Sequence, residues 1–299
     1  MSTPHILTYM RFTKAGEFRF NAGMGDVFKI PAVENIRAWG LDLIAQLSGG
    51  FLTTARQNNS ELYTNAASEL NKSNSLFLKS EVVFTERSDT RVTLVISTPT
   101  GLKLIKAKKL LITIPPRIEN LRPFALRLKE KQLFERFSNT GYTTNILNNT
   151  GIPDNVSITN AAQNTIYNLP PFPGLYDIGA TSIPGLKTAY LGTNKSKKFY
   201  PLTDAQNKKI IIDSIKILQN TYPHLYKKTE PYFVAYSNHA PFHLQVTAEE
   251  IKAGFYKKMY ALQGQRRTWW TGATWRAHDS SSIWKYTHDY VLPGLIKGL

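Results

Sequence analysis

The sequence of 299 residues contains no cysteine. This absence excludes disulfide bonds, thiol nucleophiles and thiolate metal sites, and it is compatible with a reducing, intracellular setting. Long apolar runs are absent too, since no stretch approaches the ~20 consecutive apolar residues that a membrane-spanning helix needs. The first residues lack a basic region followed by a long apolar core, so no secretory signal is predicted. We therefore expect a cytoplasmic protein without a membrane span.

Several motifs of nucleotide-binding, hydrolytic and metal sites are also missing. The sequence has neither a phosphate-binding P-loop nor the Gly-x-Ser-x-Gly motif of hydrolases. Residues 23–28 begin like a dinucleotide-binding fingerprint, but the third glycine is absent and Pro31 interrupts the helix that should follow. His239 and His243 have the spacing of a metal-binding pair on a helix, but Pro241 between them disfavours a helix. We expect no metal site.

Acidic residues are few, with 21 Asp and Glu against 37 Lys and Arg, which gives a formal net charge of +16. Such an excess can indicate nucleic-acid binding. The lysines, however, stand in scattered pairs, and no nucleic-acid-binding motif accompanies them. We therefore favour a solvated basic surface and expect no nucleic-acid partner. Binding that weakens steeply with salt would mark the alternative.

The hydrophobic content of 42% is enough for a packed core, and the length predicts one or two domains. Alternating or continuous apolar runs predict strands. Apolar residues at helical spacing predict helices, with Ser60 as the N-cap of one of them. The strands are expected at residues 80–86, 91–97, 101–106, 110–114 and 231–236. The helices are expected at residues 33–47, 59–70, 121–137, 204–222 and 248–262.

The most informative stretch covers residues 260–284. Residues 268–271 form a β-branched and aromatic run typical of a buried strand, and Gly272 follows where the backbone must turn or approach a ligand. Residues 278–282 then give a helix N-cap signal, so the unit reads as strand, glycine turn and capped helix. Ligands of open α/β sheets sit at the carboxyl ends of strands, beside the free N–H groups of such helices. Tryptophans here supply either flat walls for a planar ligand or an ordinary core: Trp269, Trp270 and Trp275.

This stretch resembles the C-terminal flavin-binding segment of fungal FAD-dependent oxidoreductases similar to beta-cyclopiazonate dehydrogenase, in the amine-oxidase-like flavoprotein superfamily. Members of this family open with a strand, a Gly-rich turn and a helix that hold the FAD pyrophosphate. The sequence has no such opening, so we expect a chain that begins partway through the family's length. Other segments agree with the family in the same order: residues 50–56, 59–63, 106–116, 139–142 and 150–157.

The resemblance implies a mixed α/β (α+β) fold with two domains. One is a partial FAD/NAD(P)-binding Rossmann-like domain, formed by residues 45–118 and 245–299 and lacking its first βαβ unit. The other is a substrate domain built on an antiparallel sheet, formed by residues 1–44 and 119–244.

The resemblance also implies FAD as the cofactor and a small molecule as the substrate. Val83 corresponds to a backbone contact with adenine, for which a plain core valine is the alternative. Arg266 and Arg267 face either a phosphate or solvent, and no catalytic base can be named. The implied flavin contacts are Gly272, Ala273, Ser281, Ser282 and Trp284, and the implied substrate contacts are Trp270, Trp275 and Tyr142.

The function that follows is oxidation of a C–N or C–C bond in a small secondary metabolite, with electrons passing to FAD. Because the pyrophosphate-binding opening is missing, we expect weak or no FAD binding by this chain alone. The alternative is a non-catalytic relic or binding module that keeps the substrate domain as a scaffold.

Overall fold

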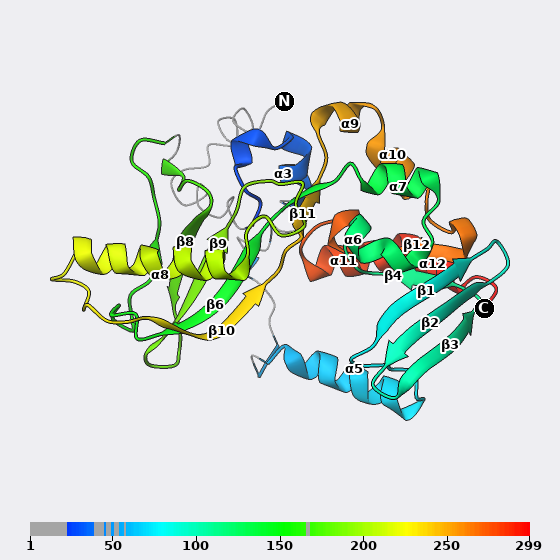
Figure 1. Ribbon diagram of the computed structural model, residues 1–299, viewed down its shortest axis with the longest axis horizontal. Helices are drawn as coiled ribbons and strands as arrows, with labels where there is room; N and C mark the ends of the chain where they lie inside the picture. Colours follow the sequence, from blue (N-terminus) through cyan, green and yellow to red (C-terminus); the bar gives the residue numbers. More distant parts are fainter. Residues whose placement is uncertain (1–22, 39–44, 46–48, 51–53, 57, 166–167) are drawn as a thin grey trace. The chain divides into compact units, whose positions relative to one another are not determined.

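The computed structural model describes residues 23–38, 45, 49–50, 54–56, 58–165 and 168–299 (Figure 1). The chain divides into two compact units, each built from separate stretches of sequence. Unit 1 comprises Met1–Asn35, Pro115–Glu119 and Gln132–Lys258. Unit 2 comprises Ile36–Ile114, Asn120–Lys131 and Met259–Leu299. Four helices have residues in both units: α3 (Ala32–Ala38), α6 (Ile118–Leu121), α7 (Leu128–Phe134) and α10 (Phe255–Tyr260).

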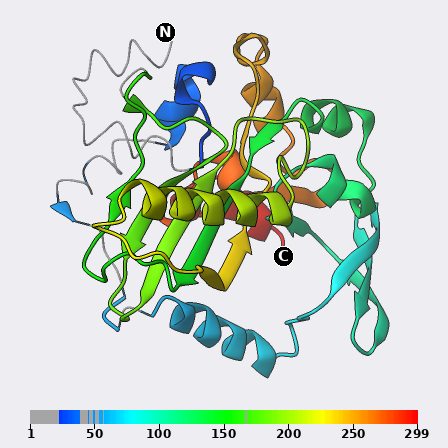
Figure 2. The same cartoon turned by 60° about the vertical axis from the view of Figure 1, so that its left-hand side comes forward.

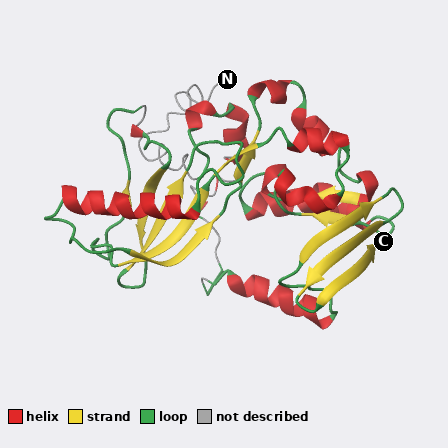
Figure 3. Cartoon of the chain, in the orientation of Figure 1, coloured by secondary structure: helices red, strands yellow, loops and turns green. Residues whose placement is uncertain are grey.

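Unit 1 is organised around a five-stranded antiparallel sheet, whose strands Figure 3 shows in yellow. The strand order is β10-β6-β9-β8-β7, so the central strand is β9. The strands are β6 (Tyr142–Asn148), β7 (Ile158–Thr159), β8 (Gly174–Ala180), β9 (Leu186–Gly192) and β10 (Tyr232–Asn238). This mixed α/β organisation with antiparallel sheets confirms the predicted fold class, and β10 confirms the strand expected at residues 231–236.

The long helix α8 (Asp204–Thr221) covers one face of this sheet, as Figures 1 and 2 both show. Thr203 and Gln206 form a reciprocal capping box at its start, which satisfies two backbone N–H groups. Ile211 and Ile215 are fully buried in one core with Leu147 and Leu191 of the sheet. The helix expected at residues 204–222 is therefore confirmed, and its apolar stripe packs against the core of the sheet.

The segment that carries Gly23 and Gly25 packs closely against Phe242 and Thr140. A Cβ on Gly23 would lie 2.4 Å from the Phe242 ring, and one on Gly25 would lie 3.0 Å from Thr140 Cγ2. Thr140 also donates a hydrogen bond from its hydroxyl to the Gly23 carbonyl. These glycines therefore serve close packing. The remaining elements of unit 1 are η1 (Val27–Lys29), β5 (Ser138–Thr140), β11 (Phe242–Gln245) and α9 (Ala248–Lys252).

Unit 2 contains an antiparallel three-stranded sheet and a separate pair of parallel strands. The sheet has the order β1-β2-β3, with strands β1 (Glu81–Arg87), β2 (Val92–Thr98) and β3 (Gly101–Ala107). The parallel pair consists of β4 (Leu110–Ile112) and β12 (Thr268–Trp270). The four strands expected between residues 80 and 114 are confirmed, although β4 ends two residues early, before the Pro115–Pro116 dipeptide.

Three predicted helices differ from the structure. The helix expected at residues 121–137 is broken into α6, η2 (Arg122–Phe124) and α7, because Pro123 and the left-handed Ala125 interrupt it. The helix expected at residues 248–262 is broken at Gly254, whose φ is +79°. For residues 33–47, α3 covers the first part, and much of the remainder lies outside the described residues.

Helix α5 (Ser60–Lys72) confirms the expected element but corrects two of its details. Ser60 is not the N-cap, because Asn59 occupies that position without a side-chain capping bond. The apolar stripe of Leu62, Ala66 and Leu70 does not face a core, since no residue of α5 is buried. In the part of the chain that the structure describes, no helix combines the length and apolar character needed to cross a membrane.

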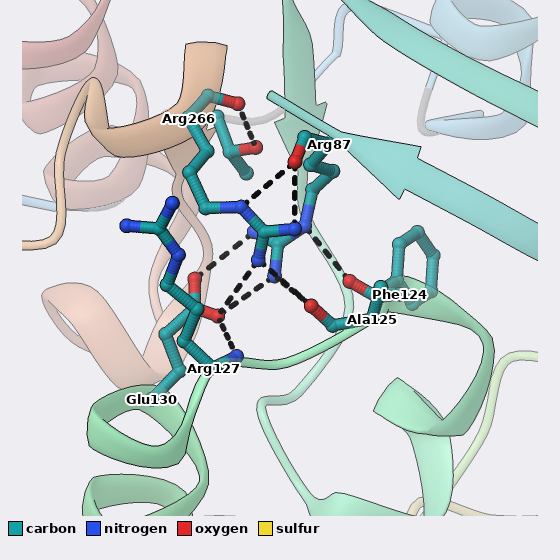
Figure 4. Close-up of polar contacts among 7 residues, drawn as sticks. Arg87, Phe124, Ala125, Arg127, Glu130 and Arg266 are labelled. Atoms are coloured by element: carbon teal, nitrogen blue, oxygen red, sulfur yellow. Dashed lines mark hydrogen bonds and ion pairs between the residues drawn. The ribbon is translucent and has the colours of Figure 1, made fainter. Parts of the chain in front are cut away.

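A buried ion pair joins the end of β1 to helix α7 (Figure 4). Arg87 donates from Nη1 and Nη2 to the two carboxylate oxygens of Glu130, over 3.0 and 2.8 Å. The side chains are 0% and 5% exposed. Arg87 Nε donates to the Phe124 carbonyl over 2.8 Å, so the guanidinium is held on two sides. The charge of each partner is therefore compensated inside the protein.

A second arginine extends this group, which we call the Arg87 cluster (Arg87, Phe124, Ala125, Glu130 and Arg266). Arg266 donates from Nε and Nη2 to the Arg87 carbonyl over 2.9 and 2.7 Å, and from Nη1 to the Ala125 carbonyl over 2.8 Å. Arg266 itself has a left-handed φ of +50°, a conformation that costs energy for a residue with a side chain. The cluster thus fastens the strained turn that leads directly into β12.

We expect Glu130→Gln to destabilise unit 2 by about 3–5 kcal/mol, because it leaves the buried Arg87 guanidinium without its countercharge. The measurement is denaturant unfolding followed by tryptophan fluorescence. Glu69→Gln is the matched control, since Glu69 pairs with Lys72 at 3.5 Å on the surface of α5 and is 79% exposed. Its removal should change the stability by less than about 1 kcal/mol. Equal losses in the two variants would contradict the importance of the cluster.

Candidate functional site

The candidate site of unit 2 is a corner at the carboxyl ends of two parallel strands. Thr268, Trp269 and Trp270 of β12 lie opposite Leu110, Leu111 and Ile112 of β4. The Thr271 N–H continues the ladder by donating to the Ile112 carbonyl over 3.1 Å. Both strands therefore run in the same direction and end at the same place. Such an edge is where open α/β sheets bind ligands.

Gly272 makes the turn after β12 and has φ +114°, a conformation that side-chain-bearing residues rarely adopt. A Cβ there would lie 3.0 Å from the Thr113 carbonyl oxygen. The chain then enters η5 (Ala273–Trp275), where the Trp275 N–H donates to the Gly272 carbonyl over 3.0 Å. Glycine is therefore required here by conformation and by the closeness of the β4 backbone.

The helix that follows begins as predicted, with Asp279 as its N-cap. The Asp279 carboxylate accepts the Ser282 N–H at 2.9 Å and the Ser281 hydroxyl at 2.6 Å. The helical backbone runs on from α11 (Ser280–Tyr286) through the π-helical turn η6 (Thr287–Val291) into α12 (Leu292–Ile296). Near the far end, Lys109 Nζ donates to the Gly294 carbonyl over 3.0 Å, which suits the negative end of the helix dipole.

Two titratable groups stand at the start of α11. The pKa of Asp279 is lowered: desolvation alone would raise it, but hydrogen bonds from Ser281 and Ser282 and the charge of Arg276 outweigh that effect. The pKa of His278 is lowered, first by desolvation from the atoms around its ring and then by the charge of Arg37, although the residue keeps an exposed surface. At neutral pH this end of the helix therefore carries one carboxylate and an uncharged imidazole.

Trp270 and Trp275 were expected as substrate contacts, with a tryptophan-rich core as the alternative. Their side chains are 0% and 1% exposed, and the two rings stack with centroids 6.0 Å apart. The Arg87 guanidinium lies 5.8 Å from the centroid of the Trp270 ring. The backbone around Trp275 is fixed as well, since the Tyr260 hydroxyl donates to its carbonyl over 2.8 Å. In this structure the two rings form the core beneath the corner and offer no surface to a ligand.

Other expected contacts are accessible. Ser281 is exposed, Ser282 and Ala273 are partly exposed, and Trp284 is 57% exposed. Val83 is 47% exposed and sits at a β-bulge of the edge strand β1, so the alternative of a core valine is wrong. A bulge leaves the extra residue out of the ladder, and its backbone groups point away from the regular pairing.

The predicted contacts do not all belong to one unit. Gly272, Ala273, Ser281 and Ser282 lie on one strand–turn–helix segment of unit 2. Val83 belongs to the three-stranded sheet of the same unit. Tyr142 belongs to unit 1, where its ring packs 4.9 Å from the Phe242 ring and 6.4 Å from the Tyr190 ring, measured between centroids.

Of the two alternatives for Arg266, the surface position is wrong, because its side chain is 11% exposed, while the phosphate contact stays a prediction. Its guanidinium donates hydrogen bonds to the carbonyls of Arg87 and Ala125 within the Arg87 cluster. Arg267 donates from Nε to the Asp89 carbonyl over 2.8 Å. The sequence left a phosphate contact and a surface position open for these arginines, because their carbonyl partners lie far away along the chain.

The histidine pair takes part in separate contacts. His239 Nε2 lies 3.0 Å from the Thr144 hydroxyl, and His243 Nδ1 lies 3.2 Å from Gln245 Nε2. Among the described residues there is no group of three or more metal-ligating side chains.

Comparison with known proteins gives a consistent picture. No protein-family model matches the chain. Over 285 residues it is 46% identical to the FAD-dependent oxidoreductase oblC of Cochliobolus heterostrophus, covering 94% of this chain and 59% of that protein. Over 295 residues it is 36% identical to the FAD-dependent oxidoreductase dpchF of Colletotrichum higginsianum, with the same coverage of each. It is 30% identical to the beta-cyclopiazonate dehydrogenase of Aspergillus flavus over 271 residues, covering 90% and 57%.

Solved structures show the same fold at low sequence identity. A fatty acid isomerase from P. acnes that produces CLA superposes with a TM-score of 0.70 and 17% identity, over 98% of this chain and 66% of that one. Cyclohexylamine oxidase from Brevibacterium oxydans superposes with a TM-score of 0.53 and 11% identity, over 95% and 64%.

The fold is thus shared with the fatty acid isomerase and with cyclohexylamine oxidase. The chain belongs to the family of fungal FAD-dependent oxidoreductases that includes beta-cyclopiazonate dehydrogenase, which confirms the resemblance. It spans about three-fifths of the length of the curated relatives that it matches.

A side chain at the φ angle of Gly272 costs about 1–3 kcal/mol in backbone strain alone. We expect Gly272→Ala to destabilise unit 2 by more than this amount, because the new Cβ also meets the Thr113 carbonyl. Gly101→Ala is the matched control, since its φ is +111° and nothing lies within 4 Å of a Cβ there. The difference between the two unfolding free energies measures the close contact. If the two losses are equal, the Thr113 contact does not constrain the corner.

Asp279→Ala should cost about 1 kcal/mol at neutral pH, because the Ser282 N–H loses its capping acceptor. The folded pKa of Asp279 is lowered, so its contribution is present above the unfolded pKa of about 3.9 and is lost as the pH falls through the folded value. The wild-type and Ala unfolding curves should therefore converge in acid. Asp279→Asn, which keeps an acceptor without the charge, should lose less at pH 7. A difference from wild type that stays constant down to low pH would contradict the charged cap.

Proposed function

We propose that this chain acts in a FAD-dependent oxidoreductase that oxidises a C–N or C–C bond of a small secondary metabolite. We assign the cofactor to residues 45–118 and 245–299, most of which belong to unit 2, and the substrate to residues 1–44 and 119–244, most of which belong to unit 1. The observation that carries the proposal is the β4–β12 corner, where two parallel strands end beside Gly272 and a capped helix follows. The FAD-dependent relatives support the cofactor.

The residues of the corner suit the edge of a flavin ring. Gly272 and Ala273 present backbone without a large side chain, and the first turn of α11 presents N–H groups that have no partner within the helix. FAD, when bound, supplies the electron-accepting chemistry. The helix end contributes only about 0.3–1 kcal/mol towards a negative ring edge, so it tunes rather than drives a reaction. The Ser282 N–H already donates to the Asp279 carboxylate. The backbone N–H groups before Ser282 are therefore the ones we assign to the ligand.

The rest of the cofactor would be held by a second set of groups. The bulged backbone at Val83 suits the polar edge of adenine, because its N–H and C=O stand outside the regular ladder. The exposed Trp284 ring is available to an aromatic ligand. Among the described residues there is no Gly-rich turn between a strand and a helix that would take the pyrophosphate. We therefore expect these contacts to give only weak FAD binding by themselves.

Titration of FAD with the purified chain, followed by flavin fluorescence, tests the proposal. We expect weak binding that becomes at least about tenfold tighter when the part of Cochliobolus heterostrophus oblC not covered by this chain is co-expressed. Ser281→Asp should abolish the gain, because it sets a negative charge against the ring edge. The same change also removes the hydroxyl that donates to Asp279 and brings two carboxylates together, so the unfolding free energy of the variant is measured beside its FAD affinity.

Ser60→Asp is the control, because Ser60 is exposed in the first turn of α5. It should leave FAD binding unchanged. If FAD binds neither the chain nor the complemented pair, the non-catalytic relic or binding module becomes the better account. If Ser281→Asp and wild type bind equally, the flavin edge does not lie at the start of α11.

A further inference from the structure

The two faces of the five-stranded sheet in unit 1 differ in chemistry. Side chains that alternate along the strands point to opposite faces. Leu147, Ala189 and Leu191 are fully buried on the face covered by α8. Lys187 of β9 is also turned to this face, and its ammonium donates to the carbonyls of Pro153, Asp154 and Val156. The opposite face carries the residues between these positions.

One lateral row on that opposite face crosses all five strands. The register pairs Ser237 with Thr144, Thr144 with Tyr190, Tyr190 with Asp177, and Asp177 with Thr159. We call these five residues the polar row. Each of them carries a hydroxyl or a carboxylate, so the row is a continuous line of hydrogen-bonding groups across the sheet. Ordinary solvated sheet faces carry Lys and Glu instead, which this row lacks.

Tyrosine rings line the row. The Tyr142 and Tyr190 rings are 6.4 Å apart between centroids and nearly parallel, at 7°. The Tyr176 and Tyr190 rings are 6.2 Å apart at 26°. The pKa of Tyr142 is raised, mainly because it is desolvated, although a hydrogen bond with the Tyr176 side chain opposes the shift. Tyr176 is buried, whereas Tyr142 and Tyr190 are partly exposed and place aromatic rings beside the hydrogen-bonding line.

Asp177 is the one carboxylate in the polar row. The Thr159 hydroxyl donates to its Oδ2 over 3.2 Å. Within the part of the chain that is described, no lysine, arginine or histidine forms an ion pair with Asp177. Burial raises its pKa, against the opposing effect of the Thr159 hydrogen bond. A half-buried carboxylate without a countercharge is costly, and it marks a place where a ligand can supply the missing donor.

We propose that the polar row binds the donor-bearing end of the substrate, with an N–H or O–H group donating to the Asp177 carboxylate and the substrate ring packed against Tyr142 and Tyr190. The ligand class is a small ring compound with at least one N–H or O–H donor. The inference rests on the proposed function only in that it takes this ligand to be the substrate. A carboxylate acceptor gives specificity for such a donor, because a ring without one leaves Asp177 with the Thr159 hydroxyl alone and no charged or ligand donor.

The test uses two probes that differ by one donor, indole and N-methylindole, with the whole chain and without FAD. Affinity is measured by ligand-observed NMR titration. Indole should bind at least about tenfold more tightly, because only indole can donate an N–H hydrogen bond to the Asp177 carboxylate. Asp177→Ala should remove this advantage while leaving N-methylindole binding unchanged. Tyr142→Ala should weaken both probes, since it removes ring contact and leaves the acceptor.

Asp213→Ala is the matched control, because Asp213 is an exposed carboxylate of α8 paired with Lys209 at 2.7 Å. It should bind both probes like the wild type. Asp177→Asn, of nearly the same size as the wild-type residue, should still fold and should bind indole more weakly. The proposal is overturned if indole and N-methylindole bind alike, or if Asp177→Ala and Asp177→Asn both bind indole like the wild type.

The two proposals fail in different ways. A chain that binds indole through Asp177 but never binds FAD keeps the polar-row site and loses the proposed flavin function. A chain that binds FAD but shows no dependence on Asp177 keeps the flavin function and loses the polar-row site.

Discussion

The buried pair of Arg87 and Glu130 is the constraint on which unit 2 depends. It fixes the end of β1 to α7, and through the Arg87 carbonyl it also holds Arg266, whose left-handed backbone begins the turn into β12. The position of β12 in turn sets where Gly272 turns and where α11 begins. A chain of polar contacts that never reaches a ligand thus determines the geometry of the candidate corner. Such pairs cost desolvation energy, and here the carbonyls of Phe124 and Ala125 share the compensation.

The five-stranded sheet of unit 1 has one face packed against a helix and an opposite face of different chemistry. One face is closed by α8 around Ile211 and Ile215, which gives a rigid apolar layer. Because strand residues alternate, a well-packed layer on one side leaves the opposite side free to carry chemistry without loss of the core. The polar row and its tyrosines occupy that second side. The packed core and the row proposed to bind the substrate therefore lie on opposite faces of one sheet.

The sequence predicted much of this architecture, because hydrophobic periodicity depends only on neighbouring residues. It located the strands of the three-stranded sheet, helix α8, and the strand–glycine–helix unit with Asp279 or a serine as cap. It left alternatives open where the outcome depends on distant partners. The hydrogen bonds of Arg266 are made with carbonyls far along the chain, and the burial of Trp270 depends on the residues packed around it. One signal was readable: Glu130 falls in the apolar stripe expected for residues 121–137, and an inward-facing carboxylate demands a buried cation.

The bulge at Val83 has a consequence for how the protein behaves in concentrated solution. An edge strand with a regular ladder is a template for pairing with another copy, and this can lead to aggregation. In β1 the register shift between Val82 and Phe84 breaks the row of pairing groups, while β3 at the other edge carries Lys103 and Lys106. Irregular geometry on one side and positive charge on the other thus guard the three-stranded sheet against unwanted self-association.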